Sequence, residues 1–266
     1  AWSTASLNMF QHGPSMLFLT VNLYLILLAR KKPALIQYAS LPLAFSYVMR
    51  PSNSISIILL SAFVLIWYRR YFIRYLLWAL PVAVPFVIYN LLVYQWPLST
   101  YYFSVGRTDT LPSFFEGLAG TIISPGRGLL VFSPILALSI AGLFMKREER
   151  SGKRLDYFLA AIVVLNWITF ASIDDWWGGH SFGPRYFTDM MPYMVYLMIP
   201  VLMLMAKSRG LDKLALGWCV MVLIAISFFI HYKGATDIDA QSWNFHPDVD
   251  TNPGRLWDWR DISFFR

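Results

Sequence analysis

Residues 75–94 read YLLWALPVAVPFVIYNLLVY, a run of twenty residues without an Asp, Glu, Lys or Arg. A helix needs about 20 predominantly apolar residues to cross the hydrocarbon core of a bilayer. A strand is excluded, because an isolated strand leaves its backbone polar groups unsatisfied in lipid and a barrel strand would alternate in polarity. The run therefore predicts a membrane-spanning helix, and similar runs recur along the chain.

The composition of the whole chain also indicates a membrane protein. Hydrophobic residues make up 57% of the chain, charged residues only 14%, and the mean hydropathy is +0.51, whereas soluble domains carry about 25% charged residues. We expect an all-α, polytopic membrane domain at residues 1–231 and an extracytoplasmic tail at residues 232–266. The expected spans, about eight, are residues 14–29, 35–49, 55–68, 75–94, 129–145, 157–173, 190–206 and 214–231.

The connections between these runs alternate in charge. Segments 30–32, 69–74, 146–154 and 207–213 hold 14 of the 22 Lys and Arg residues. Because short basic loops stay in the cytoplasm, the segments at 95–128 and 174–189 and the tail are expected on the outer face. The net charge of +7 then reflects topology and does not indicate a nucleic-acid surface.

The chain lacks the residues that ion transport, nucleotide binding and thiolate metal sites require. The expected spans contain no charged side chain for an ion path, and the chain has no glycine-rich nucleotide loop. Cys219 is the only cysteine, which excludes internal disulfides and thiolate metal sites and predicts a packed, inert thiol. Asn22, Asn90 and Asn166 lie within spans, where hydrogen bonds between helices are expected.

The densest group of polar and aromatic side chains is residues 174–189, DDWWGGHSFGPRYFTD. Arg185, between Pro184 and Tyr186, offers a permanently charged guanidinium that suits a phosphate or pyrophosphate. His180 is a candidate donor to that phosphate or a proton relay.

Other side chains of this segment fit the same task. Asp174 and Asp175 are candidates for a general base or for ligands of a divalent cation, although no cofactor is required by the sequence. Trp176 and Trp177 suit stacking on a sugar or contact with acyl chains, and Gly178 and Gly179 would let the backbone approach an anion. The alternative is an ordinary interfacial loop, with Trp anchors, solvated Asp and an Arg185–Asp189 pair.

Two further outer turns each offer an arginine. Ser124–Gly128 is a glycine-flanked turn whose Arg127 would be free to face an anion. The alternative for Arg127 is a re-entrant turn with a snorkelling side chain. Arg50 precedes Pro51 at the turn between the second and third spans and is a weaker candidate.

A family resemblance rests on segments spread along the chain. They are Trp2–Ser6, Gln11–Pro14, Arg50–Pro51, Tyr89–Asn90, Glu116–Gly117, Ser124–Gly128, Phe132–Pro134, Trp176–Gly179, Phe182–Tyr186 and Leu256–Arg260. In this order and at these spacings the chain resembles, over nearly its whole length, the C-terminal part of bacterial GT-C class membrane glycosyltransferases. That class is related to protein mannosyltransferases and to RgtA/B/C/D-like lipopolysaccharide sugar transferases.

The resemblance implies a function at the bacterial cytoplasmic (inner) membrane. Enzymes of this class take a sugar from a polyprenyl-phosphate donor and transfer it, usually with inversion, to a lipid, glycan or protein acceptor at the outer face. Their catalytic Asp lies in the first outer loop of the full-length protein, so the resemblance places the main base upstream of Ala1. Arg185, His180, Arg127, Trp176, Trp177, Arg50 and Tyr186 are then the expected substrate-binding residues.

Two other classes compete with this interpretation. A lipid-linked sugar flippase or transporter would show repeat symmetry and polar or broken helices at the membrane midplane. A membrane scaffold subunit would have outer loops that do not converge. Convergence of the outer arginines and the 174–180 segment distinguishes the enzyme from the scaffold.

Overall fold

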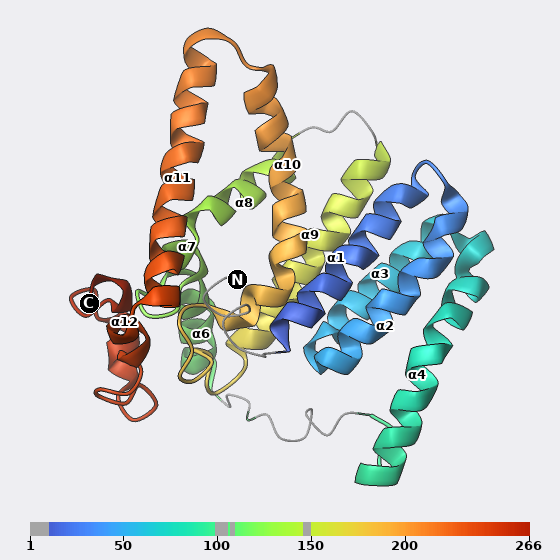
Figure 1. Ribbon diagram of the computed structural model, residues 1–266, viewed down its shortest axis with the longest axis horizontal. Helices are drawn as coiled ribbons and strands as arrows, with labels where there is room; N and C mark the ends of the chain where they lie inside the picture. Colours follow the sequence, from blue (N-terminus) through green and yellow to red (C-terminus); the bar gives the residue numbers. More distant parts are fainter. Residues whose placement is uncertain (1–10, 99–105, 107–109, 146–149) are drawn as a thin grey trace. The chain divides into compact units, whose positions relative to one another are not determined.

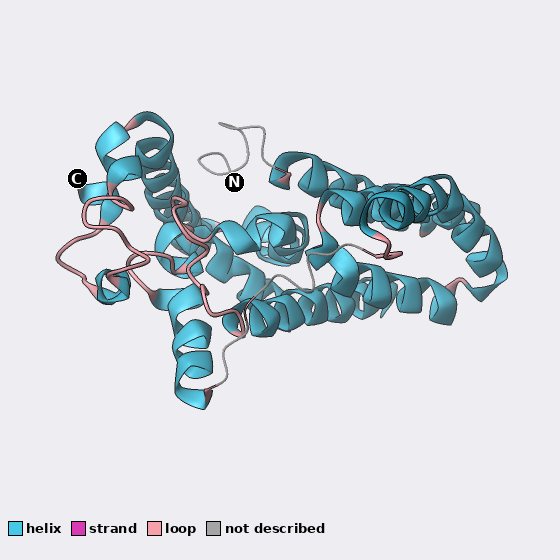
Figure 2. Ribbon diagram, turned by 90° about the horizontal axis from the view of Figure 1, so that it is seen from below, coloured by secondary structure: helices cyan, strands magenta, loops and turns pink. Residues whose placement is uncertain are grey.

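A computed structural model gives the structure of the protein and describes residues 11–98, 106, 110–145 and 150–266. Its elements are α-helices and short 3-10 helices (Figure 2). The one β-type pairing in these residues is a bridge between Phe245 and Asp248. The predicted all-α class is therefore confirmed for the described part of the chain.

The chain divides into two compact units, which we call the N-terminal unit (residues 11–105) and the C-terminal unit (residues 106–266) (Figure 1). This division differs from the boundary expected at residue 231. Helix α11 continues through that position to Thr236, and the tail packs within the C-terminal unit. The tail is therefore part of the same unit as the 174–189 segment.

The N-terminal unit consists of helical segments that begin repeatedly at proline. In order they are α1 (His12–Ala29), η2 (Pro33–Ala39), α2 (Ser40–Met49), η3 (Pro51–Asn53), α3 (Ser54–Trp67), η4 (Arg69–Tyr71) and α4 (Phe72–Tyr94). Pro33 and Pro51 each stand at the first helical position, where the missing N–H is no loss. Buried amides link the segments: Asn22 Nδ2 donates to Ala39 O at 2.7 Å, and Asn53 Nδ2 donates to Ser15 Oγ at 2.7 Å.

The C-terminal unit combines three long helices, α9, α10 and α11, with shorter ones. It contains α6 (Leu111–Ile123), α7 (Leu129–Phe132), η5 (Pro134–Leu136), α8 (Ala137–Phe144), α9 (Arg150–Ala171), η6 (Arg185–Met190), α10 (Met191–Lys207), α11 (Gly210–Thr236), α12 (Ile238–Ser242), η7 (Pro253–Trp257) and η8 (Ser263–Phe265). Helices α10 and α11 form the hairpin drawn in orange in Figure 1. Leu138, Met194 and Val201 belong to the apolar core that joins α8 to α10.

Five helices among the described residues are long and apolar enough to cross a membrane. They are His12–Ala29, Arg69–Tyr94, Gly152–Ala171, Arg185–Lys207 and Gly210–Thr236. The other three expected spans correspond to shorter segments. Residues 129–145 are interrupted between Phe132 and Pro134, because a residue before proline is driven out of the helical region and proline donates no backbone hydrogen bond.

Some residue-level expectations need correction. Asn22 joins two helical segments as expected, but Asn90 donates to Phe86 O and Asn166 to Ile162 O within their own helices. Cys219 was expected to be packed and is exposed on α11. The helix α6, at Leu111–Ile123, occupies part of the expected 95–128 connection.

Candidate functional site

The 174–189 segment and the tail share a small aromatic core. Trp176, Trp243, Val249 and Leu256 form a buried cluster, with Trp177 and Trp257 packed against it. The Trp176 ring lies directly on Gly120 of α6, where an added Cβ would come within 2.3 Å of a ring carbon. Trp176 is therefore a core side chain in this structure, and Trp177, half-buried beside it, is the more accessible of the two.

Arg127 is buried at the centre of this core. Its Nε donates to Trp177 O at 2.9 Å, and Nη1 donates to Gly126 O at 2.8 Å. Nη2 donates to Gly179 O at 2.9 Å and to Asn244 Oδ1 at 2.5 Å. The guanidinium also lies 5.6 Å from the centre of the Trp243 ring. One side chain thus ties together the 124–128 turn, the 174–180 segment and the tail.

The burial of Arg127 affects its charge and its role. Burial, together with the cations Arg185 and Arg255, lowers the pKa of Arg127 to about 9, while Asp250 opposes the shift. The group is still a cation at neutral pH. Because its donors already bind protein oxygens, Arg127 would have to give up those bonds to reach an anion directly.

Arg185 differs from Arg127 in that its guanidinium donors are not taken up by protein oxygens of the described residues. It begins η6, is half-buried, and its guanidinium carbon lies 5.5 Å from the centre of the Tyr186 ring. Within the described residues its guanidinium makes no ion pair and no hydrogen bond, and the alternative pair with Asp189 is not formed. The positive φ of +75° at Gly178 brings the backbone against Arg185, since a Cβ there would lie 2.9 Å from Nε.

Asp174 and Asp175 lie exposed beside this arginine. Partial burial and the neighbouring carboxylates Asp250 and Asp174 raise the pKa of Asp175, although Arg185 acts in the opposite direction. Tyr186 Oη donates to the backbone oxygen of Asp175 at 3.3 Å, which holds the start of the segment near η6. The N–H of Gly178 donates to Asp175 O at 2.9 Å, so this amide is not open to an anion.

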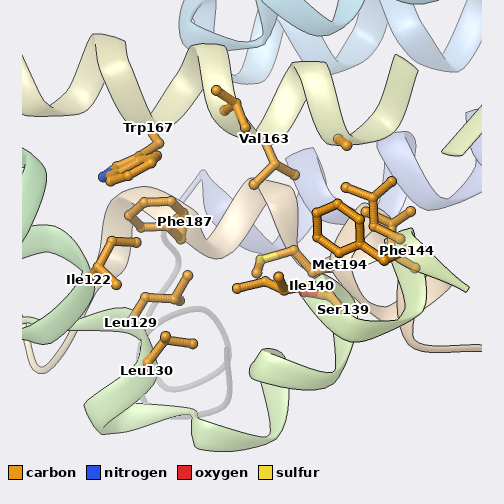
Figure 3. Close-up of a pocket in the computed structure, with 14 residues that line it drawn as sticks. Ile122, Leu129, Leu130, Ser139, Ile140, Phe144, Val163, Trp167, Phe187 and Met194 are labelled. Carbon is orange, nitrogen blue, oxygen red and sulfur yellow. The ribbon is translucent and has the colours of Figure 1, made fainter. Parts of the chain in front are cut away.

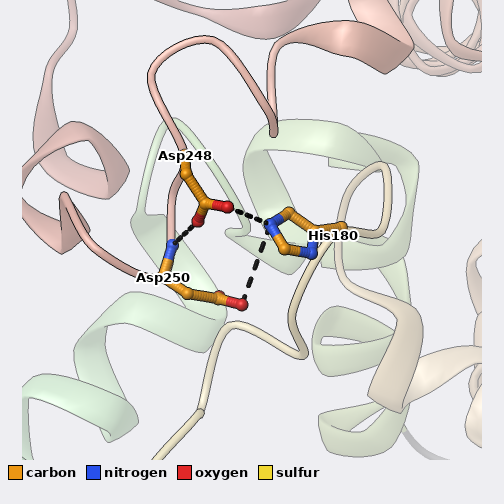
Figure 4. Close-up of side chains that lie close together, drawn as sticks. All are labelled: His180, Asp248 and Asp250. Carbon is orange, nitrogen blue, oxygen red and sulfur yellow. Dashed lines mark hydrogen bonds and ion pairs between the residues drawn. The ribbon is translucent and has the colours of Figure 1, made fainter.

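His180 meets two acids that sequence analysis did not single out. Its Nε2 lies 3.3 Å from Asp248 Oδ2 and 3.7 Å from Asp250 Oδ2 (Figure 4). The backbone N–H of Asp250 and then His180 hold the pKa of Asp248 below its ordinary value. The signal that was missed is Asp248-Val-Asp250, two carboxylates spaced two residues apart in an aromatic tail.

Arg50 belongs to the N-terminal unit. Its Nη1 lies 2.8 Å from His12 Nδ1, and its Nε donates to Ser52 Oγ at 3.5 Å. The structure therefore brings Arg127, Arg185, His180, Tyr186, Asp174 and Asp175 together within one unit and places Arg50 in the other. Of the segments that carry the family resemblance, residues 2–6 lie outside the described part of the chain.

An apolar cavity of about 310 Å³ lies in the C-terminal unit. Figure 3 shows Trp167, Phe187 and Leu129 among the side chains that line it. Its remaining lining comes from α6, α7, α8, α9 and α10: Ile122, Leu130, Ser139, Ile140, Leu143, Phe144, Ala160, Val163, Val164, Met194 and Leu197. Phe187 follows Arg185 by two residues, and Leu129 follows Arg127 by two residues. The cavity therefore begins close in sequence to both arginines.

Comparison of the chain with models of protein families, with curated proteins and with solved structures finds no match. The chemical reading of the site therefore depends on its own geometry. A guanidinium that makes no ion pair within the described residues, a group of carboxylates and an apolar cavity in the same unit can together bind an amphiphilic anion and remove a proton from a hydroxyl group.

Proposed function

We propose that this protein is a membrane glycosyltransferase of the GT-C class. It takes a sugar from a polyprenyl-phosphate donor and transfers it to a lipid, glycan or protein acceptor at the outer face of the bacterial cytoplasmic membrane. In this proposal the chain crosses the membrane eight times, and the 174–189 segment and the tail lie outside.

The observation that carries the proposal is the Arg185 guanidinium, which is half-buried and makes no ion pair within the described residues. A guanidinium presents paired N–H donors that fit two phosphate oxygens at once. Arg127 lies close enough to act electrostatically on the same region, which adds positive potential. A phosphate monoester or diester is therefore the favoured ligand of Arg185.

The apolar cavity supports a lipid-linked phosphate over a soluble one. Phe187 lines the cavity two residues after Arg185, and Trp167 and Leu129 lie on its wall. An apolar chain can bury its surface there while its phosphate remains at the arginine, and burial contributes about 25 cal/mol for each Å² removed from water.

The proposed reaction is a direct displacement at the anomeric carbon. A carboxylate removes the proton of the acceptor hydroxyl, and the acceptor oxygen forms a bond to the anomeric carbon. The bond from that carbon to the phosphate oxygen breaks, and polyprenyl phosphate leaves with the electron pair. Among the described carboxylates Asp175 suits the role of base, because its raised pKa gives it a higher proton affinity than an ordinary aspartate.

Arg185 provides the test of this function. Membranes containing the protein are assayed against a panel of radiolabelled polyprenyl-phosphate sugars, with lipid, glycan and protein acceptors. We expect Arg185→Ala to lower kcat/KM by about 100-fold or more, the effect of removing one charge-stabilising donor from a transition state. Arg185→Lys should recover part of the loss. Arg260→Ala, at an exposed position in the tail, should retain wild-type turnover.

Two outcomes would overturn the proposal. Unchanged donor binding and turnover in Arg185→Ala would show that Arg185 does not bind the donor phosphate. Movement of the lipid-linked sugar across proteoliposome membranes, without transfer to any acceptor, would show a transporter instead.

A further inference from the structure

His180, Asp248 and Asp250 come from two segments that meet only in the folded protein. His180 lies in the 174–189 segment, whereas both acids lie in the tail. One ligand atom from each of the three side chains lies within 4.8 Å of the other two. In Figure 4 both carboxylates point toward the same imidazole nitrogen. Ligands around one ion of Zn²⁺ size, at about 2.0 to 2.2 Å from it, stand about 3 to 3.5 Å apart.

We propose that His180, Asp248 and Asp250 bind one divalent first-row transition ion, Mn²⁺ or Zn²⁺. The donor set combines an imidazole nitrogen with two carboxylate oxygens. Mg²⁺ and Ca²⁺ prefer oxygen ligands alone, whereas Mn²⁺ and Zn²⁺ accept both nitrogen and oxygen. Three protein ligands leave coordination positions open for water or for an oxygen of a ligand.

Contacts from outside the three side chains orient the donor atoms. Trp177 Nε1 donates to Asp250 Oδ1 at 2.7 Å, so that Oδ2 is the oxygen turned toward His180. The Phe245 ring stacks on the imidazole at a centroid distance of 4.7 Å, which restricts the rotation of His180. Outer contacts that hold metal ligands in one orientation are a general feature of metal sites.

The charge around the three side chains also favours a cation. Asp250 acts electrostatically on Asp175, and Asp174 adds a further negative charge there. Against these acids stand Arg185 and the buried Arg127. With Asp248 included, four carboxylates stand against three guanidinium groups, because Arg255 also acts on Arg127. A bound divalent ion would neutralise the excess negative charge.

The role of the ion rests on the proposed function. Arg185 and Asp250 both act on Asp175 and on Arg127, so the ion and the Arg185 guanidinium would share one neighbourhood. The ion would take one phosphate oxygen of the donor into an open coordination position while Arg185 binds the others. It would thereby stabilise the negative charge that develops on the departing lipid phosphate.

Direct measurement of metal binding tests the site without any sugar donor. The purified full chain in lipid nanodiscs is stripped with EDTA, and Mn²⁺ is titrated by electron paramagnetic resonance and Zn²⁺ by calorimetry. We expect one ion per chain, with affinity at least about tenfold weaker in Asp248→Asn, Asp250→Asn and His180→Gln. Co²⁺ loaded in place of Mn²⁺ should lose the visible bands of a nitrogen ligand in His180→Gln.

Asp258→Asn is the matched control. Asp258 is exposed in the same tail, and its Oδ1 accepts from the backbone N–H of Arg260 as Asp248 Oδ1 accepts from that of Asp250. This variant should bind the ion like the wild type. Thermal unfolding of each variant shows whether weaker binding reflects a lost ligand or a misfolded tail, since His180→Gln and Asp250→Asn keep side-chain size.

Failure of the site and failure of the function are separable. Failure of the stripped wild type to bind Mn²⁺ or Zn²⁺ on titration, or equal binding in the wild type and in well-folded ligand variants, would overturn the metal site. Metal binding without sugar transfer would retain the site and reject the glycosyltransferase. Transfer that persists in EDTA with no bound ion would retain the enzyme and reject the proposed role of the ion in the reaction.

Discussion

At the scale of single residues, Arg127 is a buried guanidinium that links three segments of the chain through hydrogen bonds to protein oxygens. It binds the backbone oxygens of Trp177 and Gly179 and the side chain of Asn244. Arg127→Met fills similar volume but leaves these buried acceptors unpaired, at about 1 to 3 kcal/mol for each. We expect a clear fall in the Tm of the protein in nanodiscs, measured by intrinsic tryptophan fluorescence, together with weaker donor binding.

Arg260→Met serves as the control for this change, because Arg260 is exposed. It should keep the wild-type Tm. A variant Arg127→Met that keeps its Tm but loses donor binding would instead make Arg127 a direct ligand of the phosphate.

The same residue shows where prediction from sequence stops. Arg127 and Arg185 look alike locally, since each follows a Gly-containing turn on an expected outer segment. The structure buries Arg127 because Asn244, 117 residues away, supplies an acceptor and Trp243 covers it. The local sequence pattern predicts which side chains have the charge to bind an anion. Their exposure depends on distant partners that no local pattern contains.

At the scale of elements, the tail is held by a charged contact around Asp261. Arg255 donates to Asp261 Oδ2 at 3.1 and 2.7 Å, and Arg266 donates to Oδ1 at 2.9 and 2.6 Å. Partial burial raises the pKa of Asp261, but the hydrogen bonds from both arginines outweigh it and hold the pKa below its ordinary 3.8. Stability from this contact is therefore present above pH 3.8 and is lost as the pH falls through the lowered pKa.

Because this contact is lost in acid, we expect the tail to become less stably folded at low pH. Hydrogen exchange of the tail amides, corrected for the intrinsic pH dependence of exchange, should lose protection below pH 3.8. At neutral pH Asp261→Asn should exchange about tenfold faster or more, because a charge-assisted hydrogen bond contributes about 1.5 to 3 kcal/mol. Asp258→Asn should behave like the wild type. Equal protection in Asp261→Asn and the wild type would show that the aromatic core alone holds the tail.

The sequence predicts the ends of helical segments at positions where a proline interrupts the helix. The interruption before Pro134 follows from residue type alone. The aromatic core that joins the tail to the 174–189 segment does not, because Trp176, Trp243 and Leu256 are widely separated in the chain. Pairing of Asp248 and Asp250 with His180 depends on that core and was missed for the same reason.

At the scale of the whole molecule, the proposal of eight crossings depends on whether the short helices of the N-terminal unit reach across the bilayer. The segments η2 and α2 hold 7 and 10 residues. Because a 3-10 helix rises about 2.0 Å per residue and an α-helix 1.5 Å, together they reach about 29 Å. The segments η3 and α3, with 3 and 14 residues, reach about 27 Å on the same basis. Both lengths approach the hydrocarbon thickness of about 30 Å.

Single cysteines test these crossings, because Cys219→Ser removes the only cysteine of the chain. In that background Lys31→Cys, Ser52→Cys and Arg70→Cys probe successive turns of the N-terminal unit, and Thr251→Cys probes the tail. A membrane-impermeant maleimide applied to intact spheroplasts should label Ser52→Cys and Thr251→Cys. It should label Lys31→Cys and Arg70→Cys only after permeabilisation, as short basic loops require. If Ser52→Cys also needs permeabilisation while Thr251→Cys does not, α2 and α3 turn back within the inner leaflet and the chain crosses six times.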